Sequence, residues 1–274
     1  MHRFAFFVDG SNLYGAIRNM GLRINDYQPF YRYIYEHAVI AWNEANRASV
    51  LPPAQLRRIY WYVVGQIDIW DLNNPNTQQR LRDRYERERR FKSFYMSEAG
   101  RSMPGSEQRL VADRAWALCL EELQRWYGGL HDRLEGMRRF YHAVRTATDF
   151  IDIIECGRWR VDFMNFAVEE KGLDTSLAVD MVALAENYDV AVVLSGDYDM
   201  IPSIKYMKTR NKHVAAVEFL NGYPPEKKGR NFSSHIKLHA DFVVQVYEMD
   251  LVRSGVASKV DARPETNSNY WPEE

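Results

Sequence analysis

The stretch from residue 190 to 194, VAVVL, limits the fold more than any other part of this 274-residue chain. All of its residues are apolar, and the polar turn SGDYD follows directly. A short run without a polar position is typical of a strand buried on both faces, as in parallel sheets. Helical patterns flank it at 171–189 and 202–210, and further apolar strands follow at 213–219 and 240–246. This alternation predicts a doubly wound α/β fold with a mostly parallel central sheet.

The first half of the chain adds similar elements and one different section. Strands are predicted at 3–8 and 57–65, and helices at 13–20 and 27–47. The section 73–148 instead holds two arginine-rich helical stretches separated by the loop 100–105. Strand signals return at 150–161, where they suggest a hairpin. We therefore expect one domain over residues 1–253, with a helical arginine-rich insertion at about 73–148 and a flexible C-terminal tail at 254–274.

The overall composition excludes several classes of protein. The formal net charge is −1, so any binding of nucleic acid must come from a local basic patch. Only two cysteines are present, and their spacing predicts neither a disulfide framework nor a cysteine zinc site. The sequence shows no signal peptide and no apolar run long enough to span a membrane. These features lead us to expect a cytoplasmic protein that does not bind a membrane.

Carboxylates follow the predicted strands at the positions where a parallel sheet binds ligands. Asp9 ends the first strand, Asp197 and Asp199 follow VAVVL, and Asp174 and Asp180 lie in the helical stretch between. Ligands of open parallel sheets bind outside the carboxyl ends of the strands. Carboxylates gathered there repel one another unless they bind cations or change protonation. Oxygen ligands of this kind suit Mg²⁺ or Mn²⁺, and such ions promote hydrolysis of phosphodiesters by activating water.

Ordinary local roles explain most of these side chains singly. An aspartate before a helix, such as Asp174, is a typical N-cap, and Asp9 with Asn12 can also cap the next helix. Aspartates in the turn 195–199 are common turn residues. Asp180 is harder to explain in this way, because it borders the apolar stripe of its helix, where an unpaired charge is costly. The metal hypothesis depends on all of these carboxylates meeting at one edge of the sheet.

Three motifs resemble those of a known family. The segments VDGSN (8–12), KGLDTSLAVDM (171–181) and SGDYDMIPSI (195–204) are similar to the NYN domain, of the LabA-like type, in the PIN-like nuclease superfamily. The resemblance covers about residues 3–65 and 150–250 and leaves the arginine-rich insertion unexplained. It implies a PIN-like three-layer sandwich and a metal-dependent endoribonuclease that uses Mg²⁺ or Mn²⁺ on RNA.

The resemblance also implies roles for individual residues. The acidic residues that would bind the metal and serve catalysis are Asp9, Asp174, Asp180, Asp197 and Asp199. The residues that would contact the substrate are Ser11, Asn12, Lys171 and Ser195. Some members of this broad family are thought to bind without cutting. An RNA-binding or adaptor protein with a silent site, and a nuclease acting on DNA, therefore remain alternatives.

The insertion contains a local basic excess between residues 80 and 92. Arginines such as Arg84, Arg87 and Arg90 can contact phosphates, and interleaved aromatic residues can stack on the bases of single-stranded RNA. The alternative is a solvated helix with ion pairs one turn apart, such as Glu86 with Arg90. Apolar residues between 116 and 127 predict either the core of a helical subdomain or the interface of a homo-oligomer.

Overall fold

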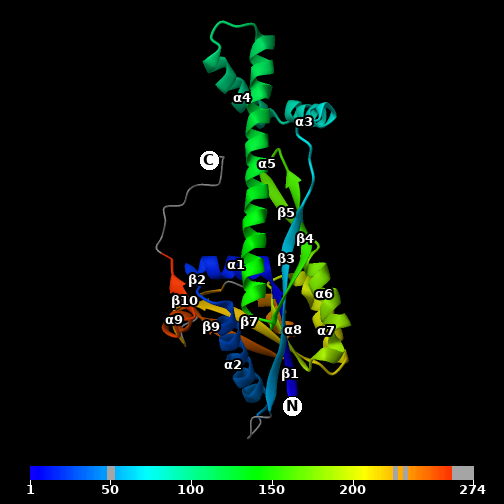
Figure 1. Ribbon diagram of the computed structural model, residues 1–274, viewed down its shortest axis with the longest axis vertical. Coiled ribbons are helices and arrows are strands. Elements are labelled where there is room, and N and C mark those ends of the chain that lie inside the picture. The colour runs from blue at the N-terminus through cyan, green and yellow to red at the C-terminus, as the bar shows by residue number, and fades with distance from the viewer. Residues whose placement is uncertain (48–52, 225–227, 231–233, 261–274) are drawn as a thin grey trace. The chain divides into compact units, whose positions relative to one another are not determined.

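The computed structural model describes residues 1–47, 53–224, 228–230 and 234–260, which form two compact units (Figure 1). The first unit contains Met1–Val64, Phe140–Gly157 and the described residues from Gly172 onward. The second contains Gly65–Arg139 and Arg158–Lys171. Within the described residues, no helix combines the length and the apolar character that a membrane span requires.

The central sheet has the strand order β5-β4-β3-β1-β6-β7-β8, and β9 also pairs with β7. Its strands are β1 (His2–Asp9), β3 (Ala54–Ile67), β4 (Ile151–Asp162), β5 (Ala167–Lys171), β6 (Val190–Leu194), β7 (His213–Asn221), β8 (Lys228–Arg230) and β9 (Phe242–Tyr247). The pairs β1–β3, β1–β6, β6–β7 and β7–β9 are parallel, whereas β4–β5 and β7–β8 are antiparallel. The predicted α/β fold with a mostly parallel sheet is therefore confirmed, and its flanking helices are consistent with a PIN-like sandwich.

Both faces of the first unit's sheet are covered by aromatic packing. Alternate residues of a strand point to opposite faces, so the neighbouring residues Phe6 and Phe7 of β1 meet different partners. The ring of Phe6 packs edge-on against Tyr31 of α2 (Tyr27–Asn46), at 6.0 Å between centroids. The ring of Phe7 packs against Tyr188, which precedes β6, at 5.3 Å. The buried strand β6 accordingly lacks any polar residue.

The remaining helices of the first unit connect these strands. They are α1 (Gly10–Asn19), α6 (Leu173–Ala183), α7 (Ile201–Thr209), α8 (Ser234–His239) and α9 (Glu248–Arg253), with short 3-10 helices η1 (Ala185–Asn187) and η2 (Tyr198–Met200). A separate small sheet pairs β2 (Leu22–Ile24) with β10 (Ala257–Lys259) in antiparallel fashion. Part of the expected flexible tail is thus a paired strand, and residues 261–274 lie outside the described residues.

The second unit is built from α3 (Pro75–Arg87), α4 (Arg89–Ser102), most of α5 (Gln108–Ala147) and the hairpin formed by the end of β4 with β5. Its helices pack through aromatic rings: Tyr85 of α3 lies 5.5 Å from Trp116 of α5 and 6.2 Å from Phe91 of α4, centroid to centroid. The expected hairpin within residues 150–161 is wrong. That stretch is one strand, and the turn comes later, between β4 and β5.

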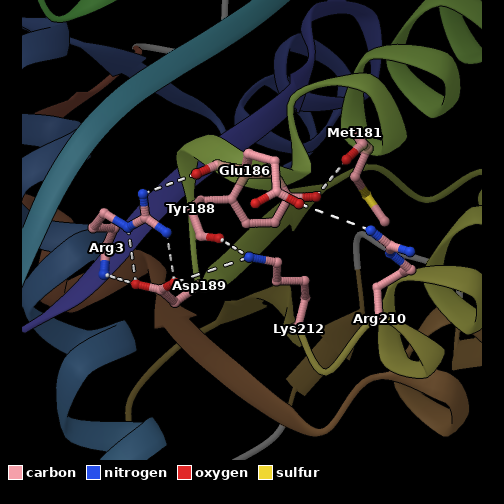
Figure 2. A network of polar contacts seen from close by, with 7 residues as sticks. All are labelled: Arg3, Met181, Glu186, Tyr188, Asp189, Arg210 and Lys212. Atoms are coloured by element: carbon pink, nitrogen blue, oxygen red, sulfur yellow. Dashed lines mark hydrogen bonds and ion pairs between the residues drawn. The ribbon is translucent and has the colours of Figure 1, made fainter.

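The amino ends of the parallel strands are joined by charged side chains (Figure 2). Arg3 of β1 donates from Nη2 to Oδ1 of Asp189 at 2.8 Å and from Nε to Oδ2 at 3.1 Å. Lys212 donates to the carbonyl oxygen of Tyr188 at 2.7 Å and lies 3.9 Å from the Asp189 carboxylate. Because Asp189 and Lys212 directly precede β6 and β7, this network connects three strands at their starts.

Candidate active site

Asp9 is the last residue of β1 and is almost fully buried, with 3% of its surface exposed. Its Oδ1 accepts a hydrogen bond from the backbone N–H of Asn12 at 2.9 Å, and its Oδ2 accepts one from the Asn12 side-chain amide. Asp9 is therefore the N-cap of α1, as its local role predicted. Gly10 is required next, because a Cβ there would lie 2.7 Å from the carbonyl oxygen of Tyr62.

The turn after β6 lies beside Asp9, because β1 and β6 are parallel neighbours with Val8 opposite Leu194. The hydroxyl of buried Ser195 donates to Oδ2 of Asp9 at 3.5 Å and accepts from the backbone N–H of Asp197 at 3.1 Å. The backbone N–H of Gly196 donates to Oδ1 of Asn12 at 3.3 Å. These bonds tie the ends of two strands into one polar edge.

Asp174 reaches the same edge from helix α6. This helix begins at Leu173, with Gly172 as its N-cap in a left-handed conformation at φ 91°, so the interpretation of Asp174 as an N-cap is wrong. Asp174 lies in the first turn of this helix. Partial burial and the negative charges of Asp197 and Asp9 raise the pKa of Asp174 to about 6. The structure thus brings Asp9, Asp174 and Asp197 together.

The other two candidate carboxylates have different surroundings. Asp180 accepts a hydrogen bond from the hydroxyl of Tyr62 in β3 at 3.0 Å. It lies six residues after Asp174, which places it about 9 Å farther along the helix. The side chain of Asp199 is exposed, and its backbone N–H donates to Oδ1 of Asp197 at 2.8 Å.

The candidate substrate contacts are distributed over both units. Ser11 and Asn12 lie in the first turn of α1, next to Asp9. Lys171 ends β5 in the second unit, where it is exposed and forms an ion pair with Glu169. The arginines at 84, 87 and 90 are exposed in the second unit. The predicted homo-oligomer through the insertion stays a prediction.

The chemistry of this edge suits a hard divalent cation. Among the residues that the structure describes, no group of three or more His, Cys, Asp or Glu side chains is arranged to hold a metal ion. Mg²⁺, however, is usually held by one or two carboxylates together with waters and substrate phosphates. The oxygen atoms that could bind such a cation at this edge belong to Asp9, Asp174, Asp197 and Asn12. A bound cation would also oppose the effects of burial and of the neighbouring negative charges, which together raise the pKa of Asp174.

Tyr62 is the site residue that sequence reasoning missed. It is fully buried, and burial together with the nearby Asp180 carboxylate raises the pKa of its hydroxyl. In the sequence Tyr62 is one of several aromatic residues in a predicted strand, and its partner lies 118 positions away. The only available signal was the unexplained polar position of Asp180 beside an apolar stripe.

Residues 120–236 match the family model of the NYN domain, which confirms the resemblance. The match is to the domain in general and does not distinguish its LabA-like branch. It includes Asp174, Asp180, Asp197 and Asp199, whereas Asp9 lies before it. NYN domains have a PIN-like nuclease fold and are generally nucleases, which supports a nuclease role for this chain.

Solved and curated proteins add little to this picture. The crystal structure of a protein of unknown function from Vibrio parahaemolyticus is similar, with 14% sequence identity and a TM-score of 0.40. The similarity covers 89% of this chain and 93% of that chain. A comparison with curated proteins found no match.

Proposed function

We propose that this chain, whose residues 120–236 match the NYN domain, is an endoribonuclease that hydrolyses phosphodiester bonds of single-stranded RNA with Mg²⁺ or Mn²⁺. One observation carries the proposal beyond the family. Asp9, Asp174 and Asp197 come from β1, α6 and the turn after β6, and they lie close enough that two of them raise the pKa of the third. Carboxylates gathered in this way are typical of sites that bind a cation.

The residues at this edge have distinct proposed roles. Asp9, Asp174 and Asp197 would hold the metal, which supplies neutralisation of the phosphate and activation of water when it is bound. Ser195 and Asn12 position the carboxylate of Asp9 through hydrogen bonds. Such positioning partners usually matter nearly as much as the ligands themselves.

Less direct roles remain for the other candidates. Asp180 and Asp199 would act on the metal through water or maintain the arrangement of α6 and the turn after β6. Ser11 would contact a phosphate of the substrate. Lys171, which belongs to the second unit, would also bind the substrate. The alternatives are an RNA-binding protein with a silent site and a nuclease acting on DNA.

Cleavage of labelled oligonucleotides by the purified full chain tests this proposal. We expect RNA to be cut with Mn²⁺ or Mg²⁺ and to remain uncut with EDTA. Asp9→Asn and Asp197→Asn should each reduce the rate by about a thousandfold, equivalent to the several kcal/mol that a metal contributes. Asp152→Asn is the matched control, because Asp152 is a carboxylate on β4 that pairs with Arg58.

The same measurement separates the alternatives. Faster cleavage of DNA than of RNA would identify a deoxyribonuclease with the same chemistry. Binding of RNA without any cleavage in either metal would identify a silent site. Unchanged cleavage in both the Asp9→Asn and Asp197→Asn variants would contradict the proposed site.

A further inference from the structure

One face of helix α3 carries a row of exposed arginines. Arg80, Arg84 and Arg87 are spaced by four and three residues, so they lie within about 60° of one another around the helix. All three side chains are exposed, whereas Leu81 and Tyr85 are buried on another face of the helix. Two more exposed arginines, Arg89 and Arg90, begin α4. We call these five residues, three along one side of α3 and two at the start of α4, the arginine face.

The arginines of this face differ from the neighbouring basic residues, which form ion pairs. Arg82 pairs with Asp113 at 2.7 Å, and Lys92 pairs with Glu86 at 2.5 Å. Glu86, which the alternative interpretation paired with Arg90, thus pairs with Lys92. For the five arginines of the face, the structure records no ion pair with any described residue. Their positive charge is thus available to an external anion, with exposed Glu88 as a carboxylate between the two helices.

An aromatic ring accompanies the arginines on α4. Phe94 follows Arg90 by four residues and therefore lies on the same side of the helix. Its side chain is 46% exposed, whereas Phe91 and Tyr95 are buried. Cations that contact phosphates beside a ring that can stack on a base are the usual combination in proteins that bind single-stranded nucleic acid.

The helices that carry this surface are held in place by the core of the second unit. The hydroxyl of Tyr95 donates to Glu122 of α5 at 2.7 Å, and the rings of Tyr85 and Trp116 pack together. The backbone is therefore ordered before any ligand arrives. A preordered surface loses less conformational entropy on binding than a flexible tail does.

We propose that the arginine face and Phe94 bind single-stranded RNA, with arginines on the phosphates and a base stacked on Phe94. This surface would act in capture of RNA and would not take part in hydrolysis. The inference rests on the proposed function only for the choice of RNA as the polymer. Its test is therefore made without metal, where hydrolysis plays no part.

Binding of a labelled oligouridylate to the full chain in EDTA, over a series of salt concentrations, tests the charge component. Each lost phosphate contact makes the plot of log K against log salt shallower by about 0.7 for single strands. The triple variant Arg80→Ala, Arg84→Ala and Arg87→Ala should therefore reduce the slope by about 2. The wild-type slope should also be steeper than that of this variant at every chain length tested.

A matched control removes the same charge from elsewhere in the second unit. Arg101, Arg114 and Arg160 each form an ion pair, with Glu98, Glu121 and Glu169 respectively. Replacing these three by alanine should leave the slope nearly unchanged. An equal reduction in both triple variants would show an effect of net charge alone and would overturn the inference.

Phe94→Leu tests the stacking component, because leucine keeps the apolar bulk and removes the ring. We expect at least about a fivefold loss of affinity for single-stranded RNA, from the usual contribution of one stacked base. Affinity for duplex RNA, whose bases are already stacked, should change less. Unchanged affinity for single strands, or a wild-type chain that binds no RNA in EDTA, would overturn the inference even if cleavage with metal were observed.

Discussion

The two ends of strand β6 place the same kind of side chain in opposite electrostatic surroundings. Asp189 precedes the strand and receives hydrogen bonds from Arg3, which lower its pKa to about 2 (Figure 2). Asp197 follows the strand and lies beside Asp174, whose pKa is raised to about 6. At the amino ends of the strands, basic side chains contact the carboxylate of Asp189. At the carboxyl ends, several carboxylates lie near one another.

This difference separates a stabilising site from a functional one. Ion pairs that lower the pKa of a carboxylate favour the folded state at neutral pH. A cluster that raises the pKa of a carboxylate works against folding, and such clusters are concentrated at sites that bind or react. The two edges should therefore respond to substitution in opposite ways.

The largest contrast is expected in catalysis. Asp174→Asn should reduce cleavage of RNA by about a thousandfold, because it removes a proposed ligand of the metal. Asp189→Asn should leave the rate within about threefold, since Asp189 lies at the amino end of the strand, away from the proposed site. The rates of RNA cleavage by the two variants are compared with Mn²⁺ at a temperature well below the melting temperature of both, so that unfolding does not contribute. Equal losses in both variants would contradict the separation of roles.

The second contrast concerns stability at the amino edge. Asp189→Asn removes the charge that Arg3 and Lys212 contact. We expect the free energy of unfolding at pH 7 to fall by about 1 to 2 kcal/mol, from the size of the pKa shift with a discount for solvent screening. Urea denaturation of the two proteins measures the difference. Arg58→Gln, which removes a more exposed ion pair with Asp152, is the control and should cost less.

The same comparison has a defined pH dependence. Because the pKa of Asp189 is lowered from 3.8 to about 2 in the folded chain, its contribution to stability is complete above pH 3.8. The contribution is lost as the pH falls toward about 2. Wild type and Asp189→Asn should therefore become equally stable in this window. A difference that persisted unchanged below it would show that the lost stability comes from packing.

The smallest expected effect is a gain in stability at the carboxyl edge. Asp174→Asn removes a charge repelled by Asp9 and Asp197. In EDTA, we expect the free energy of unfolding to rise by up to about 1 kcal/mol at pH 7, after allowance for partial exposure. Thermal and urea unfolding measure the change. A loss of stability would show that favourable contacts of the Asp174 carboxylate outweigh the repulsion.

Long apolar elements were predictable, and short polar ones were not. The runs that became β1, β6 and β7 were evident because each contains at least four consecutive apolar residues that are buried. The strands β2 and β10 have three residues each, too few for a period to show. The strand β5, AVEEK, carries mostly exposed side chains and has no apolar pattern. Its pairing with β4 depends on the turn between the two strands, at residues 163–166. The hairpin expected within 150–161 placed this turn too early in the chain.

The sequence by itself determined which strands are buried, that Asp9 ends one of them, and that Asp197 lies in the turn after another. This follows from local apolar pattern, because a buried strand must end where polar residues begin. Only the tertiary structure decided which carboxylates lie together: Asp174 lies beside Asp197, whereas Asp180 accepts a hydrogen bond from Tyr62. The tertiary structure also decided which arginines form ion pairs with carboxylates. These outcomes depend on distances between residues far apart in the chain, because electrostatic energy follows distance in space and local pattern carries no information about it.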